Sequence, residues 1–198
     1  MSADDVSLLF IHGFNSGPEG HKVGLLREFL ARHGMEDRLR VPQLPVDPRR
    51  AMAVLEAELA AAGPAALVGS SLGGFYATWL AVHHDLKAVL INPVVQPWRL
   101  LADNAVELAA ATGGDGASVD LDALDNALRH YEVEEIPRPE NLLVMVQAGD
   151  EVLDWRDAAE FYADCSFYRS LNGSHAFDDF DAFIPLVLRF CGIRCESP

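Results

Sequence analysis

A serine between two glycines, in the stretch Gly69-Ser70-Ser71-Leu72-Gly73, is the first group in this chain whose setting could support chemistry. In a Gly-X-Ser-X-Gly pattern, a sharp turn from a strand into a helix lifts the serine hydroxyl above the edge of a sheet. An apolar run at 65–68 precedes the pattern, and an amphipathic segment at 72–82 follows it, as this turn requires. The pattern therefore predicts Ser71 as a nucleophile.

A serine hydroxyl is a poor nucleophile at neutral pH unless a neighbouring base accepts its proton. Of the seven histidines, His175 lies in a polar loop between the last short strand expected and the last helix, which makes it the candidate base. His12, close to the start, is expected to hold its own loop by hydrogen bonds. The remaining histidines are interpreted as surface or unremarkable positions: His21, His33, His83, His84 and His130.

The acid that orients the histidine should follow the apolar run at 142–146, where Asp150, Glu151 and Asp154 lie close together. Asp150 is favoured because it comes soonest after the strand, whereas Glu151 is expected to point to solvent. Asp154 is the rival, although an Asp at that position could instead cap a helix that begins near Trp155. The resulting chain order of serine, acid and histidine is that of α/β-hydrolases.

Acyl transfer through Ser71 would also need two backbone amides to stabilise an oxyanion, each worth roughly 3–4 kcal/mol in the transition state. The amide of Leu72, directly after the nucleophile, is one candidate. The other should come from the loop after the first strand, where Phe14 is the preferred donor. No His-Glu-X-X-His or comparable cluster occurs in the sequence, so neither a metal nor a cofactor is expected.

The elements that must position these groups alternate along the chain. Short apolar runs predict strands at 8–11, 39–44, 65–68, 88–91, 142–146 and, more briefly, 166–169. Helical spacing predicts helices at 21–33, 48–62, 72–82, 121–130 and 180–191. Strands that alternate with helices indicate a mostly parallel sheet of about six strands with helices on both faces, since parallel neighbours need long crossovers.

Three details of these elements are open to test. Pro42 and Pro45 should shorten the second strand or push it to the sheet edge. Pro185 conflicts with the last helix, which it should kink or restrict to the residues beyond it. Asp178 and Asp179 are expected to cap that helix.

One segment, 94–140, interrupts the alternation. It begins with apolar residues, contains the glycine-rich loop 113–116 and has one possible helix at 121–130. We expect residues 1–198 to form a single domain in which 94–140 is a small helical cap insertion, because long insertions of this kind often cover active sites. The alternative is an additional pair of helices packed beside the sheet.

Composition excludes several classes of protein. The chain has 198 residues and a formal net charge of -15, without a basic run, so nucleic acid is not expected as a partner. No apolar stretch approaches the ~20 residues of a membrane span, and the first residues are acidic where a secretory signal would be basic. A cytoplasmic location is therefore expected. The three cysteines have no metal-binding or disulfide pattern and are interpreted as idle thiols.

The sequence resembles the YqiA-type esterases, a group of bacterial α/β-hydrolases. The similar segments run in order along nearly the whole chain, and the likeness fades between about 100 and 140. They are 12–16, Pro42-Gln43-Leu44-Pro45, 68–80, Asn92-Pro93, Gly149-Asp150-Glu151-Val152-Leu153-Asp154 and Gly173-Ser174-His175-Ala176-Phe177. The resemblance implies an α/β-hydrolase fold and esterase or thioesterase activity on small or acyl-chain compounds, with the triad on Ser71, Asp150 and His175.

The sequence thus predicts a serine hydrolase that forms an acyl-Ser71 intermediate. Two alternatives stay open. One is a catalytically silent α/β-hydrolase fold used as a binding protein, and the other is an acyl-CoA thioesterase in place of a carboxylesterase. A thioesterase for a polyanionic carrier would need a basic patch, for which Arg27, Arg99 and Arg156 are the candidates. The oligomeric state has no signal in the sequence.

Overall fold

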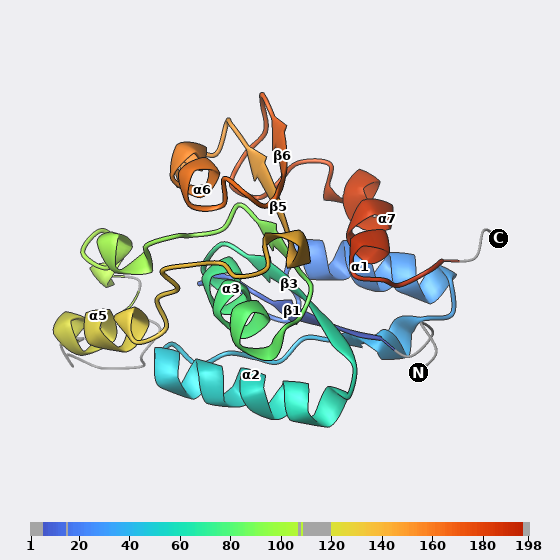
Figure 1. Ribbon diagram of the computed structural model, residues 1–198, viewed down its shortest axis with the longest axis horizontal. Helices are drawn as coiled ribbons and strands as arrows, with labels where there is room; N and C mark the ends of the chain where they lie inside the picture. Colours follow the sequence, from blue (N-terminus) through green and yellow to red (C-terminus); the bar gives the residue numbers. More distant parts are fainter. Residues whose placement is uncertain (1–5, 15, 107, 109–119, 196–198) are drawn as a thin grey trace.

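Six parallel strands form the centre of the protein (Figure 1), for which a computed structural model describes residues 6–14, 16–106, 108 and 120–195. The predicted parallel sheet is confirmed, and the strands lie side by side in the order β2-β1-β3-β4-β5-β6. They are β1 (Ser7–Ile11), β2 (Leu39–Arg40), β3 (Ala65–Ser70), β4 (Ala88–Ile91), β5 (Leu142–Gln147) and β6 (Ser166–Ser170). All six carboxyl ends therefore lie along one edge of the sheet.

Helices cover both faces of this sheet, as the alternating pattern predicts. The described α-helices are α1 (His21–Arg32), α2 (Pro48–Ala62), α3 (Leu72–His84), α5 (Leu121–Arg129), α6 (Trp155–Phe161) and α7 (Phe180–Phe190). Short 3-10 helices occur at η2 (Glu36–Arg38), η3 (Pro97–Leu100) and η4 (Pro139–Asn141). Helices α1 and α7 pack together on one face, and α2, α3, α5 and α6 contribute to the core on the other.

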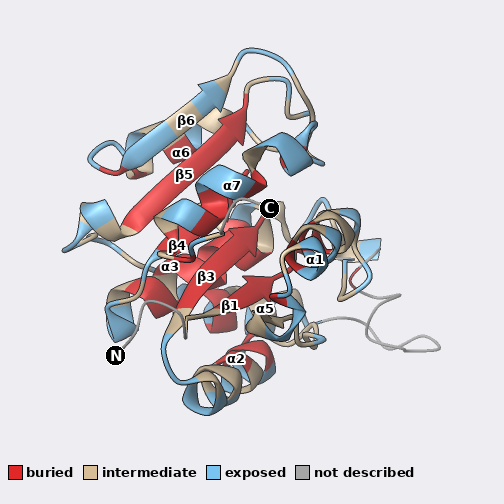
Figure 2. Ribbon diagram, turned by 90° about the vertical axis from the view of Figure 1, so that its right-hand side faces the viewer, coloured by how far each residue is buried: buried red, intermediate tan, exposed pale blue. Residues whose placement is uncertain are grey.

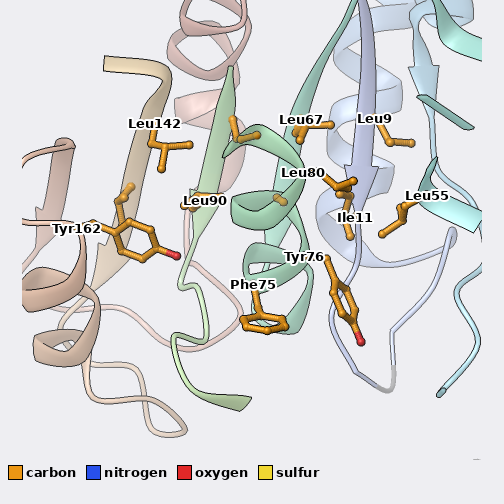
Figure 3. Close-up of a cluster of buried hydrophobic side chains, with 14 of the residues drawn as sticks. Leu9, Ile11, Leu55, Leu67, Phe75, Tyr76, Leu80, Leu90, Leu142 and Tyr162 are labelled. Carbon is orange, nitrogen blue, oxygen red and sulfur yellow. The ribbon is translucent and has the colours of Figure 1, made fainter. Parts of the chain in front are cut away.

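The central strands are buried on both faces (Figure 2), because their side chains alternate between two hydrophobic clusters. Leu9 and Ile11 of β1 join the cluster under α2 and α3, part of which Figure 3 shows. Leu8 and Phe10 of the same strand join the cluster under α1 and α7. Burial on both faces explains why these strands appear in the sequence as continuous apolar runs.

The second strand is shorter than its apolar run suggests. Only Leu39 and Arg40 pair with β1, opposite Leu8 and Leu9, and β2 forms the edge of the sheet. Pro42 has no backbone N–H to continue the ladder, so the expected shortening is observed. The chain beyond β2 instead runs as a loop toward α2, whose first turn is capped by the Asp47 carboxylate at 2.9 Å from the Arg50 amide.

Two expectations for the last helix are not met. Helix α7 includes the residues before Pro185, so it is not restricted to those beyond the proline. Pro185 and Asp181, whose carbonyl loses its usual partner, are both exposed, so water can satisfy that carbonyl. Asp179 occupies the N-cap position, but its side chain makes no capping hydrogen bond. The Asp178 carboxylate does not cap the helix either, and instead accepts a hydrogen bond from the Ser174 hydroxyl at 2.7 Å.

The segment 94–140 contributes η3, α5 and η4 to the described structure. Helix α5 packs against η3 and α2, and Leu128 on its inner side is buried in the core. The glycine-rich loop at 113–116 lies outside the described residues. The helix predicted at 121–130 is observed at 121–129.

The cysteines are unpaired thiols, two of them buried. Burial raises the pKa of Cys165 to about 11 and that of Cys191 to about 12, which leaves both thiols protonated at neutral pH. Among the described residues, no helix has both the length and the apolar character that crossing a membrane requires.

Candidate active site

Ser71 occupies a strained turn between β3 and α3. Its φ is 56° and its ψ is -122°, a backbone conformation that a residue with a side chain rarely adopts. Two glycines make the turn possible, because a Cβ on Gly73 would meet the carbonyl of Ile11 and one on Gly69 would meet the carbonyl of Gly73. The turn is fixed further by the Ser71 amide, which donates to the carbonyl of Ile91 at 3.0 Å.

His175 lies within hydrogen-bonding distance of this serine although 104 positions separate them in the chain. The distance from Nε2 of His175 to Oγ of Ser71 is 3.1 Å. The loop that carries His175 joins β6 to α7 and brings the imidazole over the carboxyl edge of the sheet. A neutral imidazole in this position can accept the proton of an attacking hydroxyl.

Asp150 lies on the other side of the imidazole. Its Oδ2 is 2.8 Å from Nδ1 of His175, and its Oδ1 accepts hydrogen bonds of 2.9 Å from the amides of Val152 and Leu153. The Asp150 side chain is only 3% exposed, against 24% for His175. The carboxylate is thus held by the turn after β5 in an orientation that favours the Nε2-unprotonated tautomer of the histidine.

The two neighbouring carboxylates have other partners. Asp154 caps α6, since its Oδ1 accepts from the Arg156 amide at 3.0 Å. This hydrogen bond and a second one from the Arg156 guanidinium to the same oxygen, at 3.0 Å, lower the pKa of Asp154. Glu151 is exposed as expected, yet its carboxylate also accepts from the backbone amide of His175 at 3.0 Å, which the sequence did not indicate. Neither side chain is hydrogen-bonded to the imidazole.

The two amides expected to bind an oxyanion belong to residues that line one cavity with Ser71 and His175. Leu72 is the first residue of α3, and Phe14 lies in the loop after β1. Within the part of the chain that the structure describes, neither amide donates a hydrogen bond to another protein group. Both donors are therefore free for a ligand, as an oxyanion hole requires.

His12 holds the loop that carries Phe14. Its Nε2 accepts a hydrogen bond of 3.2 Å from the Leu44 amide, so the proton lies on Nδ1, which donates to the carbonyl of Gly13 at 2.9 Å. The side chain is buried and ties the loop after β1 to the loop after β2. His12 therefore has the structural environment that the sequence suggested.

The cavity beside Ser71 has a volume of about 240 Å³ and a mostly apolar lining. Its walls come from the loops after β1, β2 and β5, from α3, and from the segment 94–140. The residues from that last segment are Val94, Pro97, Leu100, Leu101, Asn104, Leu108, Leu124 and Leu128. No lysine or arginine is among the described lining residues, and no cluster of metal-ligating side chains occurs in the described ranges.

Sequence reasoning missed three residues that support the histidine loop. Asn92, after β4, donates from its side chain to the carbonyls of Ser174 and His175 at 3.0 and 3.2 Å. The side-chain oxygen of Gln147 accepts from the Ser174 amide at 3.0 Å. Polar residues at the carboxyl ends of β4 and β5 were the available signal.

Lys22, in the first turn of α1, is the third residue that supports the histidine loop. Its ammonium group donates to the carbonyl of Ala176, next to the candidate base, at 2.8 Å. Burial lowers the pKa of Lys22, although the nearby Asp150 carboxylate acts in the opposite direction. A lysine on an amphipathic helix carries no signal of this contact in the sequence.

The sheet order, the strained serine turn and the histidine loop define an α/β-hydrolase fold, and solved structures of this class match nearly the whole chain. Mouse alpha/beta hydrolase domain-containing protein 10 is 18% identical, with a TM-score of 0.68 over 96% of this chain and 89% of that one. A structure from the metagenome-derived lipolytic enzymes LipS and LipT is 17% identical, with a TM-score of 0.67 over 95% and 94%. Est1E from Butyrivibrio proteoclasticus, solved with ferulic acid bound, is 16% identical, with a TM-score of 0.61 over 96% and 89%.

Within this class, the chain belongs to the uncharacterised protein family UPF0227, whose model matches residues 7–192. The match spans every strand and helix described above. At identities of 14–22%, the solved structures establish the fold alone.

Proposed function

We propose that this protein is a serine hydrolase that cleaves small carboxylic esters through an acyl-Ser71 intermediate. The observation that carries the proposal is the continuous hydrogen-bonded line from Ser71 through His175 to Asp150, at 3.1 and 2.8 Å, beside a cavity with two free amides. Two structural neighbours support it: the structure from the lipolytic enzymes LipS and LipT, and Est1E with its bound ferulic acid. The resemblance to YqiA-type esterases implies the same chemistry.

In the first half of the reaction, Oγ of Ser71 attacks the carbonyl carbon of the ester while Nε2 of His175 takes the hydroxyl proton. The carbonyl oxygen becomes an oxyanion, to which the amides of Phe14 and Leu72 donate. When the tetrahedral intermediate collapses, His175 gives its proton to the departing alcohol oxygen. The acyl group then remains on Ser71.

In the second half, water replaces the alcohol. His175 takes a proton from the water as its oxygen attacks the acyl carbon, and returns that proton to Oγ of Ser71 as the carboxylic acid leaves. Asp150 stabilises the protonated imidazole in both halves and keeps its Nδ1 proton in place. No metal ion or cofactor is required in either half.

The lining of the catalytic cavity favours a small, uncharged ester over a thioester of a polyanionic carrier. Its volume is about 240 Å³, and its lining is mostly apolar. None of the three candidate cations for a carrier, Arg27, Arg99 and Arg156, is among the described lining residues. Two of them are paired, Arg27 with Glu19 at 3.3 Å and Arg156 with Asp154 at 3.0 Å. We therefore assign the carboxylesterase reaction in preference to acyl-CoA hydrolysis.

Residues 94–140 act as a cap in this proposal. Pro97 and Leu100 of η3, with Leu124 and Leu128 of α5, line the cavity. An apolar wall at that position excludes water and selects the group attached to the carbonyl carbon. The remainder of the chain supplies the triad, so that the single domain 1–198 contains the whole site.

Labelling with a fluorophosphonate probe tests the function directly. We expect wild-type protein to be labelled and Ser71→Ala to be unlabelled, because the probe reacts only with an activated serine. Ser70→Ala is the matched control, since it makes the same change one residue earlier and should preserve labelling. Circular dichroism checks that each variant is folded. A folded wild-type protein that takes no label would favour the catalytically silent alternative.

A further inference from the structure

A second cavity adjoins the catalytic one on the side of the sheet edge formed by β2. Its volume is about 500 Å³, and it lies between the loops after β1 and β2 and the first turns of α2 and α3. The two cavities share four lining residues: Phe14, Val46, Leu72 and Tyr76. Because Phe14 and Leu72 also carry the candidate oxyanion amides, an ester bound at Ser71 has access to both cavities.

Tyr76 lines both cavities. The residue is only 2% exposed, and Figure 3 shows its hydroxyl pointing away from the other labelled side chains of the hydrophobic cluster. The hydroxyl makes no hydrogen bond to any residue in the described ranges. Burial and the nearby Asp47 carboxylate raise the pKa of Tyr76, so the phenol stays protonated and can donate. Among the described residues, no fully buried side-chain oxygen lacks a hydrogen-bond partner, so this hydroxyl is open to the cavities, where water or a ligand can bind it.

The polar groups around this hydroxyl indicate what kind of ligand fits. The lining of the second cavity includes Ser16, Gln43, Asp47 and Arg50, whereas the catalytic cavity is mostly apolar. Asp47 and Arg50 carry opposite charges, so the lining has no net charge. Hydroxyl, amide, carboxylate and guanidinium groups together offer both hydrogen-bond donors and acceptors.

We propose that the second cavity is a subsite for a neutral, hydroxylated arm of the ester substrate, with Tyr76 and Gln43 as specificity-determining residues. A hydroxyl both donates and accepts, which matches a mixed lining, and an uncharged arm suits a lining with one acidic and one basic side chain. The apolar arm of the same ester occupies the catalytic cavity. This inference rests on the proposed function, since it names the substrate class of that site.

Matched pairs of esters test the subsite. Glyceryl monobutyrate against propyl butyrate varies the hydroxyls on the alcohol arm, and ethyl 3-hydroxybutyrate against ethyl butyrate varies them on the acyl arm. We expect wild-type protein to prefer the hydroxylated member of at least one pair by about tenfold in kcat/KM, the scale of one or two hydrogen bonds. The pair that shows the preference identifies the arm.

Two variants locate that preference. Tyr76→Phe and Gln43→Ala should each lower the ratio of kcat/KM between hydroxylated and alkyl ester toward one. Gln43 is exposed, so Gln43→Ala should fold and can test the subsite even if Tyr76→Phe does not fold. Tyr168→Phe, in β6 and outside both cavities, is the matched control and should keep the wild-type ratio. A ratio near one in wild-type protein, or an unchanged ratio in both variants, would overturn the subsite.

Calorimetric binding to Ser71→Ala separates this inference from the proposed function, because it needs no turnover. We expect glyceryl monobutyrate or ethyl 3-hydroxybutyrate to bind more tightly than its alkyl counterpart. In the double variant with Ser71→Ala and Tyr76→Phe, this difference in affinity should disappear. Selective binding without hydrolysis by wild-type protein would overturn the esterase function and retain the subsite. Hydrolysis by wild-type protein with equal binding of both members would do the reverse.

Discussion

The side-chain oxygen of Asn92, just beyond β4, accepts a hydrogen bond of 3.0 Å from the backbone amide of Gln147 at the end of β5. Both residues are buried, and both also bind the loop that carries His175. The Gln147 side chain adds hydrogen bonds to the amide and carbonyl of Asp178, at 2.7 and 3.0 Å. The carboxyl ends of the neighbouring strands β4 and β5 therefore hold the loop that carries the candidate base.

We expect Asn92→Ala to lower kcat by about tenfold or more with a smaller change in KM, because the imidazole loses its support while the cavity walls remain. The change leaves a buried amide without a partner, which should also cost about 1–3 kcal/mol of unfolding free energy. Asn92 has a φ of 41°, so Asn92→Gly separates backbone strain from the lost side chain. Ester hydrolysis and urea unfolding provide the two measurements.

Asn126→Ala is the control for that prediction. The Asn126 side chain donates to the carbonyl of Asp122 within the exposed part of α5, at 2.8 Å, and supports no loop of the site. Its kcat should stay at the wild-type value. Wild-type kcat in Asn92→Gly would show that the side chain does not position His175.

Substitution of the two candidate acids distinguishes their roles. Asp150→Asn should reduce kcat by about 10⁴-fold, since an amide cannot stabilise the protonated imidazole and favours the wrong tautomer. Asp154→Asn should leave kcat within about twofold, because asparagine is also a good N-cap for α6. Steady-state hydrolysis of p-nitrophenyl butyrate measures both. A larger loss in Asp154→Asn than in Asp150→Asn would transfer the role to Asp154.

Replacement of Lys22 should weaken the support of the loop that carries His175. The Lys22 ammonium group donates to the carbonyl of Ala176 at 2.8 Å, and Lys22→Met removes that hydrogen bond while it keeps a side chain of similar length. We expect Lys22→Met to lower kcat by several-fold with a smaller change in KM, on the scale of one lost hydrogen bond. Lys22→Arg keeps a donor and should retain more of the wild-type kcat in ester hydrolysis. A wild-type kcat in Lys22→Met would show that this hydrogen bond does not position His175.

The sequence by itself determined the alternation of strands and helices, the serine turn and the chain order of the candidate residues. These are local properties: apolar runs on strands buried on both faces, helical periodicity, and glycines at 69 and 73 where a side chain would collide with the backbone. Such signals lie within a few residues of the element they specify. The parallel sheet then follows from the alternation, because each strand must return through a crossover.

Only the tertiary structure decided between the alternative partners of the polar side chains around the site. Asp150 and Asp154 are four residues apart, yet one is buried against an imidazole 25 positions away and the other caps its own helix. Likewise, Asn92 and Lys22 reach the His175 loop from positions 83 and 154 residues distant from their acceptors. Hydrogen bonds of this kind depend on how separate elements pack, and no local periodicity encodes that packing.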